Sequence, residues 1–531
     1  GQNVPTKGWF TVNLKVNKEP VRFTEKICGC TQEQSIELDY VLPDYYPEIF
    51  RIIKCCAEPK ITSCAANGDR ITYELTVCLK IIYCSENSSR PEAIDQKLVY
   101  SRTVNLDRSV DSPSVYISAE ADHINCRAVN RRRIDIRGAV TISINAFGDC
   151  ETDVVSEVFG GNVQLKTRSC LCPSSIIRTS RRVTVSDEFD LGADAPPIGS
   201  ILRASAEIVS SDKKTIASKV AAKGELKISI AYVPAGGEDS NVCCMQFSMP
   251  FSQLVELEGM DDTYDCRISS SVISCDIIPR SEGDGESRSI ECEVLLFIDC
   301  TAVRMSSYSI ACDEYSTSHS SSHTCTSVKT ALEPVNVESS LIVKGICENK
   351  DSPISVVYDA WCTVSKLRAV ITDGKAMAVG TAVLSVMGRT ESGDFIICET
   401  DVPIEEDLTA AAGLDGKALT ADADIRLVFS VISCGYTISD ENKAEIKAEV
   451  AARGQITGYD TVEAITDIAV DEDSPREKND EYALRLYFAE EGEELWGIAK
   501  RYGAAISRVI EENELDGDVI REGRMLLIPI A

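Results

Sequence analysis

In the stretch ITYELTVCLKIIY, residues 71–83, apolar side chains alternate with Thr72, Glu74, Thr76, Cys78 and Lys80. Side chains of a β-strand point to opposite faces in turn, so a period of two predicts a strand with one buried face. The apolar phase consists of Ile71, Tyr73, Leu75, Val77, Leu79, Ile81 and Tyr83. This phase is expected to pack into the core of a β domain.

Two strand phrases recur along the chain at regular intervals. The phrase of residues 49–83 returns at residues 198–232 and 354–388, and its first and last positions are 34 residues apart each time. A second alternating phrase starts at Ile134, Ile290 and Ile446, each start lying 156 positions after the one before. Repeats of this size exceed the roughly 20 to 50 residues of a solenoid unit. The spacing therefore predicts tandem duplicated β domains.

The length of 531 residues suits three or four domains. We predict a mainly β fold with three tandem antiparallel β-sandwich-like modules, followed by a small βααβ domain. The expected boundaries are 1–158 for module 1 with an N-terminal lead-in strand, 161–305 for module 2, 306–326 for a Ser-rich linker, 327–467 for module 3, 468–480 for an acidic linker and 481–531 for the terminal domain.

Acidic residues outnumber basic ones by 84 to 54, which leaves a formal charge of −30. A nucleic-acid backbone needs a basic surface, and so does an anionic membrane, so we expect neither as a partner. No apolar run reaches the roughly 18 residues of a membrane span. The charge favours solubility and contact with basic protein surfaces.

All 23 cysteines lie between Cys28 and Cys434, and an odd number cannot all pair within one chain. Some of them fall on the polar phase of a strand or precede the first long strand of a module. Cysteines separated by one residue could bind zinc, but no second pair lies at a fixed spacing, so we predict no metal site. The candidates for exposed, cross-linking thiols are Cys28, Cys30, Cys78, Cys84, Cys170 and Cys172.

The chain offers little material for catalysis. Its three histidines are His123, His319 and His323, and none stands in a recognisable order with a nucleophile. No glycine-rich phosphate loop follows a strand. We therefore expect no enzyme, no catalytic residue and no cofactor.

The last 50 residues change from a period of two to helical spacing and back. They contain EGEELWGIAKRYG at 491–503, then Asn513 and Leu515, then GRMLLIP at 523–529. In this order the motifs resemble a LysM domain, over residues 482–531. The resemblance implies a groove that binds polymers of N-acetylglucosamine, such as peptidoglycan.

The family has an Asp-Thr pair beside this groove, where the chain has Glu493 and Glu494. A carboxylate covered by a neutral sugar loses hydration without gaining a countercharge, whereas a basic protein supplies one. We therefore expect the domain to bind mainly protein. Trp496 suits either a hot spot of binding or a core position. The candidate groove and partner-binding residues are Gly492, Glu493, Glu494, Leu495, Trp496, Asn513 and Leu515.

Three alternating β units ahead of a LysM-like domain resemble the SPOCS arrangement of spore-envelope morphogenetic proteins. Basic residues before Ile134 fit the approach to the last SPOCS strand. The resemblance implies a non-enzymatic scaffold for the endospore coat and cortex. It also implies binding to other morphogenetic proteins, such as the ATPase of the coat basement layer, and self-association through sheet edges. The implied location is the mother-cell cytoplasm at the forespore surface, and later the spore envelope.

Two other functions stay open on the sequence. One is a peptidoglycan-binding protein of the cell wall, in which the β modules act as spacers. The other is a self-assembling filament subunit on the spore surface or outside the cell.

Overall fold

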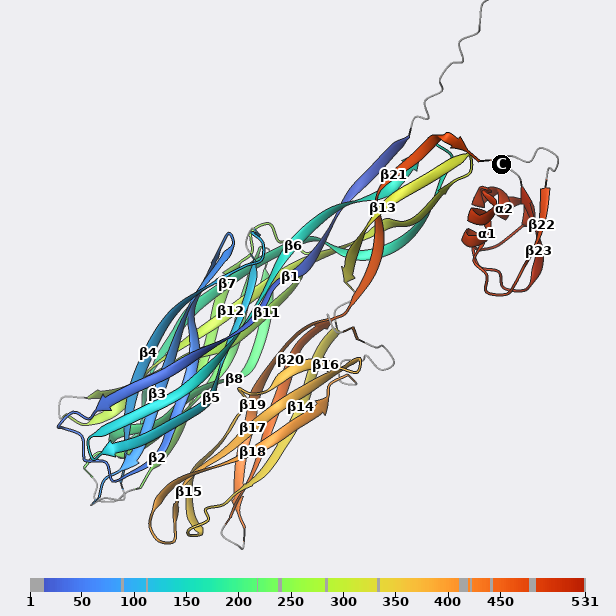
Figure 1. Ribbon diagram of the computed structural model, residues 1–531. Coiled ribbons are helices and arrows are strands. Elements are labelled where there is room, and N and C mark those ends of the chain that lie inside the picture. The colour runs from blue at the N-terminus through green and yellow to red at the C-terminus, as the bar shows by residue number, and fades with distance from the viewer. Residues whose placement is uncertain are drawn as a thin grey trace, which may run out of the picture.

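The computed structural model describes residues 14–86, 90–110, 113–216, 218–236, 241–281, 285–331, 335–409, 419–420, 423–439, 443–476 and 484–529. Antiparallel strands dominate it, as the sequence predicts, and the two helices lie in the terminal domain (Figure 1). Neither of these helices is long and apolar enough to cross a membrane.

Module 1 consists of two three-stranded sheets that face each other. One sheet has the order β1-β6-β5 and the other has the order β2-β3-β4. Their strands are β1 (Lys15–Val41), β2 (Arg51–Asn67), β3 (Arg70–Cys84), β4 (Pro91–Asn105), β5 (Ser114–Asn130) and β6 (Arg133–Phe159). The apolar phase of residues 71–83 lies in β3 and is at most 1% exposed, because it forms the centre of the core between the two sheets.

Module 2 repeats this arrangement with the sheets β7-β12-β11 and β8-β9-β10. Its strands are β7 (Val163–Asp190), β8 (Ile198–Ile216), β9 (Lys219–Pro234), β10 (Cys243–Glu256), β11 (Asp265–Ser281) and β12 (Ser287–Ser316). Its core again lies between the two sheets, with Tyr232 at the position that Tyr83 has in module 1. The two phenol groups donate equivalent hydrogen bonds, each to the carbonyl oxygen of a proline, at 3.0 Å.

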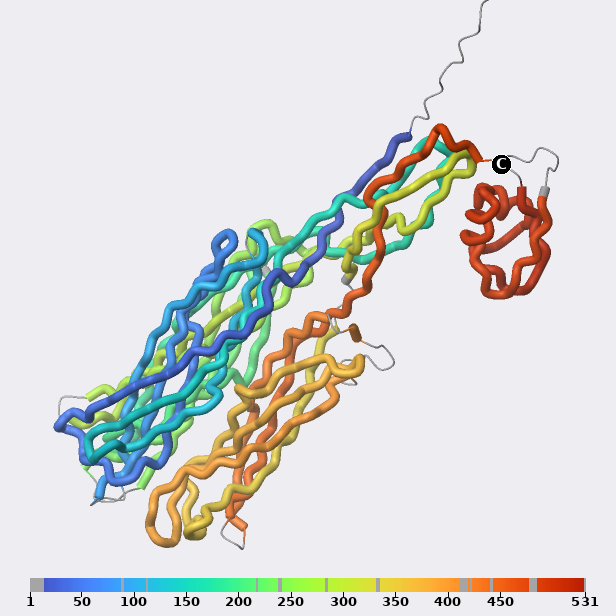
Figure 2. The backbone as a smooth tube through the Cα atoms, in the orientation of Figure 1, coloured from blue at the N-terminus to red at the C-terminus, as the bar shows by residue number. Residues whose placement is uncertain are grey.

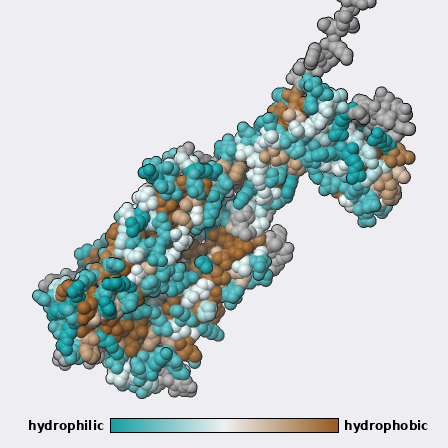
Figure 3. Space-filling model, viewed as in Figure 1, coloured by the Kyte–Doolittle hydropathy of each residue, from teal (hydrophilic) through white to brown (hydrophobic). Residues whose placement is uncertain are grey.

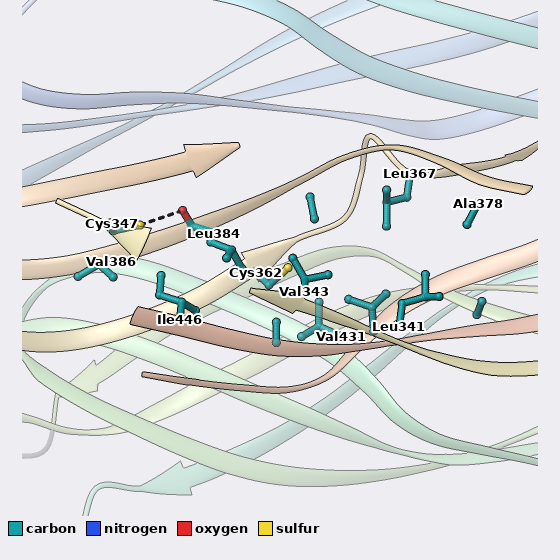
Figure 4. Packing of buried hydrophobic residues seen from close by; sticks show 14 of the residues in the cluster. Leu341, Val343, Cys347, Cys362, Leu367, Ala378, Leu384, Val386, Val431 and Ile446 are labelled. Carbon is teal, nitrogen blue, oxygen red and sulfur yellow. Dashed lines mark hydrogen bonds between the residues drawn. The ribbon is translucent and has the colours of Figure 1, made fainter. Parts of the chain in front are cut away.

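Module 3 varies the plan, because three of the six strands are each divided into two. One sheet is β14-β20-β19, and in the other β17 pairs with β15, β16 and β18. The strands are β13 (His319–Ala331), β14 (Val335–Cys347), β15 (Ile354–Thr363), β16 (Arg368–Thr372), β17 (Lys375–Thr390), β18 (Phe395–Asp407), β19 (Asp424–Ile438), β20 (Ala444–Thr457) and β21 (Tyr459–Pro475). Figure 4 shows how short side chains such as Val343, Leu384 and Val386 fill the space between these sheets.

The repeat phrases occupy equivalent places in the three modules. Ile134, Ile290 and Ile446 lie on the middle strand of their sheets, opposite the first strand, and are at most 2% exposed. Gly138 and Gly224 stand on middle strands beside a β-bulge of the neighbouring strand, whose carbonyl oxygen occupies the space of a Cβ. The bulge therefore explains why glycine recurs in these phrases.

Beyond the module bodies, three two-stranded ribbons join into a stem (Figure 1). The ribbons are the distal parts of β1 and β6, the distal parts of β7 and β12, and the pair β13–β21. Side chains from all three meet inside, with Val21, Ile310 and Val328 fully buried. Each module therefore contributes one ribbon to a common structure.

The prediction of two linkers, at residues 306–326 and 468–480, is wrong for most of their length, because strands of the stem occupy these segments. Residues 306–316 continue β12, and residues 319–326 belong to β13. Residues 468–475 belong to β21 and pair with β13, while 477–480 lie outside the described residues. These segments look like linkers because a narrow ribbon buries only a thin stripe of side chains, so polar residues fill many of its positions. The single-residue boundaries of the modules stay a prediction.

The modules are consecutive in the sequence but lie side by side in space (Figure 2). The outer faces of their second sheets share an apolar cluster that includes Cys84 of module 1, Leu202 of module 2 and Phe395 of module 3. Arg203 adds an ion pair to Asp359 of module 3 at 3.0 Å. These contacts make one body from the three modules.

The terminal domain has the predicted βααβ order. It consists of β22 (Leu484–Ala489), α1 (Leu495–Tyr502), α2 (Ile506–Asn513) and β23 (Arg524–Pro529). Gly503 ends α1 in the left-handed conformation with φ of 64°, which glycine adopts without steric cost. The helices cover one face of the β22–β23 pair and enclose a small core.

Candidate functional site

Trp496 attaches the terminal domain to the stem. It lies on the first turn of α1, is 8% exposed, and packs edge-on against Tyr315 of β12 with ring centroids 5.0 Å apart. Its indole Nε1 donates a hydrogen bond to Asp313 Oδ2 at 2.7 Å. Trp496 therefore belongs to the contact between domains, which we call the joint.

Two ion pairs flank the joint. Lys500 Nζ lies 2.5 Å from Asp313 Oδ1, and Lys166 Nζ of β7 lies 2.5 Å from Glu494 Oε2. Burial alone would raise the pKa of Asp313, but hydrogen bonds from Lys500 and Trp496 outweigh it and hold this pKa below its usual value. The Asp313 carboxylate is thus ionised and binds two donors from the terminal domain.

Tyr315 completes the joint from the stem side. It is 1% exposed, and its hydroxyl donates a hydrogen bond to the backbone oxygen of Ala504 at 2.7 Å. The ring packs with Trp496 and Ala499 in a cluster separate from the core of the terminal domain. The joint thus combines a small apolar centre with directed hydrogen bonds, which fix one orientation of the domain.

Glu493 lies in the turn between β22 and α1, and its side chain forms hydrogen bonds with residues in and beside this turn. Its carboxylate accepts hydrogen bonds from the Tyr487 hydroxyl at 2.6 Å and from the backbone N–H of Glu490 at 3.1 Å. These bonds, with that of Tyr487 the stronger, lower the pKa of Glu493. Gly492 in the same turn has a φ of 85°, and its N–H donates to the Ile520 oxygen at 2.8 Å.

Three further predicted site residues have structural roles. Leu495 is fully buried in the core of the terminal domain, and Leu515 packs against that core. Asn513 is 7% exposed, and its amide bonds both the N–H and the oxygen of Leu527, at 2.6 and 2.7 Å. The side chain therefore ties α2 to β23 rather than facing a ligand.

The terminal domain exposes an apolar sheet face on the side away from its helices. Leu486, Phe488 and Met525 are 68, 59 and 53% exposed, and Phe488 lies opposite Met525 in the strand register. Half-buried Leu527 lies opposite Leu486. Figure 3 shows apolar surface on the side of this domain where β22 and β23 lie. We call these four residues the outer sheet face.

The expected exposure of the candidate thiols is wrong at four of six positions. Cys28, Cys84, Cys170 and Cys172 are buried, and Cys30 and Cys78 are half-buried. Cys84 is buried although it lies on the polar phase of its strand, because the neighbouring modules cover the second face of that sheet. Cys170 and Cys172 point into the stem. A role of these residues in cross-linking stays a prediction.

Cys325 on β13 is the thiol that we expect to cross-link first. Of the 23 cysteines only Cys244 and Cys325 are exposed residues. The thiol group of Cys244 is nevertheless shielded from solvent by surrounding atoms, and this burial raises its pKa to about 12. The pKa of Cys325 is also raised, mainly by partial burial and secondly by the negative charge of Glu463. Disulfide formation at Cys325 should therefore accelerate as the pH rises toward that pKa, because the thiolate is the reactive form. Mild oxidation followed by non-reducing electrophoresis should show a disulfide-linked dimer that Cys325→Ser removes. A dimer that persists in Cys325→Ser and disappears in Cys244→Ser contradicts this prediction.

Sequence reasoning missed the stem half of the joint. Lys166, Asp313 and Tyr315 all lie on the β7–β12 ribbon, and two of them fall in the segment that was expected to be a linker. A signal was present, since Tyr308, Ile310 and Cys312 recur at the period of two that is typical of a strand. Over the ranges that the structure describes, no three potential metal ligands come together.

Comparison with known families agrees with this geometry. The model described as "SipL, SPOCS domain" matches residues 197–278, which run from β8 to β11 of module 2, and the LysM domain model matches residues 490–529. No curated protein and no solved structure matches the chain. SPOCS and LysM are non-catalytic binding domains, and together they fit a sporulation-related role in binding peptidoglycan or protein, associated with the cell wall. The chain therefore combines a SPOCS domain, matched at residues 197–278, with a C-terminal LysM domain.

Proposed function

We propose that the chain is a non-enzymatic scaffold for assembly of the endospore envelope, and that its LysM domain binds another morphogenetic protein. On this proposal it acts in the mother cell at the forespore surface and ends in the spore envelope. The partner that we propose is the ATPase of the coat basement layer.

One observation carries this proposal, namely the outer sheet face of a LysM domain that is held on a large body. The joint uses α1 and Glu494, so it leaves Leu486, Phe488 and Met525 open to solvent. An exposed cluster of large apolar side chains is typical of a protein-binding surface. A neutral, hydroxyl-rich glycan gains less from such a surface than the apolar centre of a protein interface does.

The charge of the turn supports a protein partner as well. Glu494 already has a cationic partner in Lys166, and Glu493 is held ionised beside Tyr487. Residues that carry a fixed negative charge near an apolar face favour a partner with a basic rim, because complementary charge raises the association rate and selects one register. Glu493 is therefore the better candidate for direct contact with a partner.

Peptidoglycan binding is the second candidate function, and the LysM match favours it. On this alternative the turn of residues 490–494 and the loop before β23 bind acetamido groups. These loops are joined by backbone hydrogen bonds, such as that from Leu495 N–H to the Asp518 oxygen at 2.7 Å. The alternative does not require the outer sheet face.

Binding assays on the full chain separate the two candidates. The full chain and the variant Phe488→Ser are tested against the purified ATPase at low salt and against purified peptidoglycan. Phe488 is a hot-spot candidate, so we expect Phe488→Ser to weaken ATPase binding about tenfold or more and to leave sedimentation with peptidoglycan unchanged. Glu493→Lys should weaken ATPase binding at low salt, and Glu493→Asp should retain it.

The matched control is Val99→Ser, which changes an apolar residue that is 59% exposed on β4, a strand of module 1 that lies far from the LysM domain (Figure 1). Unchanged ATPase binding in Phe488→Ser contradicts the proposed contact. Micromolar binding of chitin oligomers without any ATPase binding would favour the cell-wall function instead.

A further inference from the structure

A polar cavity of about 490 Å³ lies beside the joint and has no role in the proposed function. The stem supplies most of its lining through β12, β13 and the end of β21, and α1 of the LysM domain adds Lys500. The side chains that matter for its chemistry are Glu314, Ser321, His323, Ser474, Arg476 and Lys500. A volume of this size lies within the range of small-molecule sites.

Glu314 is the buried acid of this cavity. Its side chain is 2% exposed, and its Oε1 lies 3.1 Å from His323 Nδ1. Its other oxygen, Oε2, is buried and has no hydrogen-bond partner among the residues that the structure describes. A buried carboxylate oxygen without a donor is costly, so a ligand that donates a hydrogen bond to Oε2 would be stabilised here.

Two cations line the same cavity. The backbone N–H of Arg476 bonds the Ser318 oxygen at 2.9 Å, whereas its guanidinium pairs with no carboxylate among the residues that the structure describes. Lys500 binds Asp313 with one of its three donors and has capacity for another acceptor. The cavity therefore offers an acceptor at Glu314 and donors at Arg476 and Lys500.

This combination excludes ligands of a single charge. An inorganic anion would meet the Glu314 carboxylate, and a simple cation would meet Arg476 and Lys500. A ligand with both charges satisfies both groups, since an ammonium donates to Glu314 and a carboxylate accepts from the guanidinium in the bidentate manner that arginine favours. The serine hydroxyls supply further hydrogen bonds.

We propose that this cavity binds an α-amino-acid head group, with the ammonium at Glu314 Oε2 and the carboxylate at Arg476. Two sources present this chemistry. One is a free amino acid, and the other is the free zwitterionic end of a diamino acid in a peptide. The site does not include the outer sheet face, so a failure of this proposal would leave the proposed scaffold function unaffected, and the reverse also holds.

Isothermal titration of the full chain tests the site with defined probes. D-Alanine and L-alanine represent free amino acids, and diaminopimelate blocked at one end by acetylation and amidation represents a peptide end. N-acetylalanine lacks the ammonium and alaninamide lacks the carboxylate. We expect at least one zwitterionic probe to bind, and each removal of a charge to weaken binding about tenfold or more.

Variants assign each charge to its partner. Glu314→Gln should weaken binding of the zwitterionic probe about tenfold or more. It should leave binding of N-acetylalanine unchanged, because that probe has no ammonium group to interact with Glu314. Arg476→Gln should weaken the zwitterion and leave alaninamide unaffected. Arg476 follows β21 and is only half-buried, so the Arg476→Gln variant still tests the site should Glu314→Gln fail to fold.

Three results would overturn the proposal. The first is that no zwitterionic probe binds even at a concentration of about 10 mM, because a dissociation constant above this value would be too weak for a functional site. The second is equal binding of alanine and N-acetylalanine, and the third is tight binding of inorganic phosphate that excludes alanine. Selective binding of the blocked diaminopimelate over both alanines identifies the peptide end as the source.

Discussion

Replacing Leu79 by alanine is expected to lower the free energy of unfolding of module 1 by about 2 to 5 kcal/mol. Leu79 is 1% exposed and lies on β3, the middle strand of its sheet. The substitution removes apolar contacts and leaves a cavity that the two sheets cannot close, because hydrogen bonds on both sides hold β3 in place. Ile230→Ala in β9 should cost a similar amount in module 2.

Hydrogen exchange followed by mass spectrometry measures this effect module by module. Peptides from β2, β3 and β4 should lose protection in Leu79→Ala, and peptides from β17 and β18 should change much less. Val99→Ala is the matched control, because Val99 lies on the adjacent strand β4 and is 59% exposed. Equal loss of protection in Leu79→Ala and Val99→Ala would show that the β3 core does not carry the stability assigned to it.

Replacing Trp496 by alanine is expected to release the LysM domain from the stem. The indole packs on Tyr315, donates to Asp313 and belongs to the cluster of the joint rather than to the LysM core. Loss of a buried tryptophan costs about 3 to 5 kcal/mol, which shifts the docking equilibrium by about a hundredfold or more. The LysM domain itself should stay folded, since its own core around Leu495 is untouched.

Small-angle X-ray scattering of the full chain measures the release as a larger radius of gyration. Trp496→Phe keeps an aromatic ring against Tyr315 but loses the donor to Asp313, so it should cost only about 1 to 3 kcal/mol. Phe488→Ala changes an exposed aromatic of the same domain and should leave the scattering unchanged. If Trp496→Ala scatters like the unmodified chain while the LysM domain is folded, the indole does not hold the joint.

Much of the fold follows from local patterns in the sequence. The alternation of residues 71–83 predicts a half-buried strand, and the structure places its apolar phase at the centre of a core. Equal spacing of Ile134, Ile290 and Ile446 predicts repeated modules, and all three occupy equivalent middle strands. The βααβ order of the terminal domain follows from its change of period. These features depend on neighbouring residues, whose geometry is set by the backbone itself.

Contacts between distant segments are the part that the sequence leaves open. The outward burial of Cys84 depends on modules 2 and 3, and only the apolar Ile82 on the same phase of β3 hints that a second layer covers that face. Residues 306–326 look like a linker because most stem positions stay polar, yet they pair as strands with partners more than a hundred residues away. Pairing of this kind is determined by which segments of the chain meet in the folded protein, not by the local β-propensity of each segment.

The sequence by itself determined the β modules, their repetition and the βααβ domain, since each is encoded in the period of its apolar residues. Only the tertiary structure decided that three ribbons form one stem, that Trp496 serves the joint, and that Glu314 and Arg476 share a cavity. The physical reason is that burial depends on what covers a side chain. For these residues the covering atoms come from other parts of the chain, so that their role appears only when the modules and the LysM domain pack together.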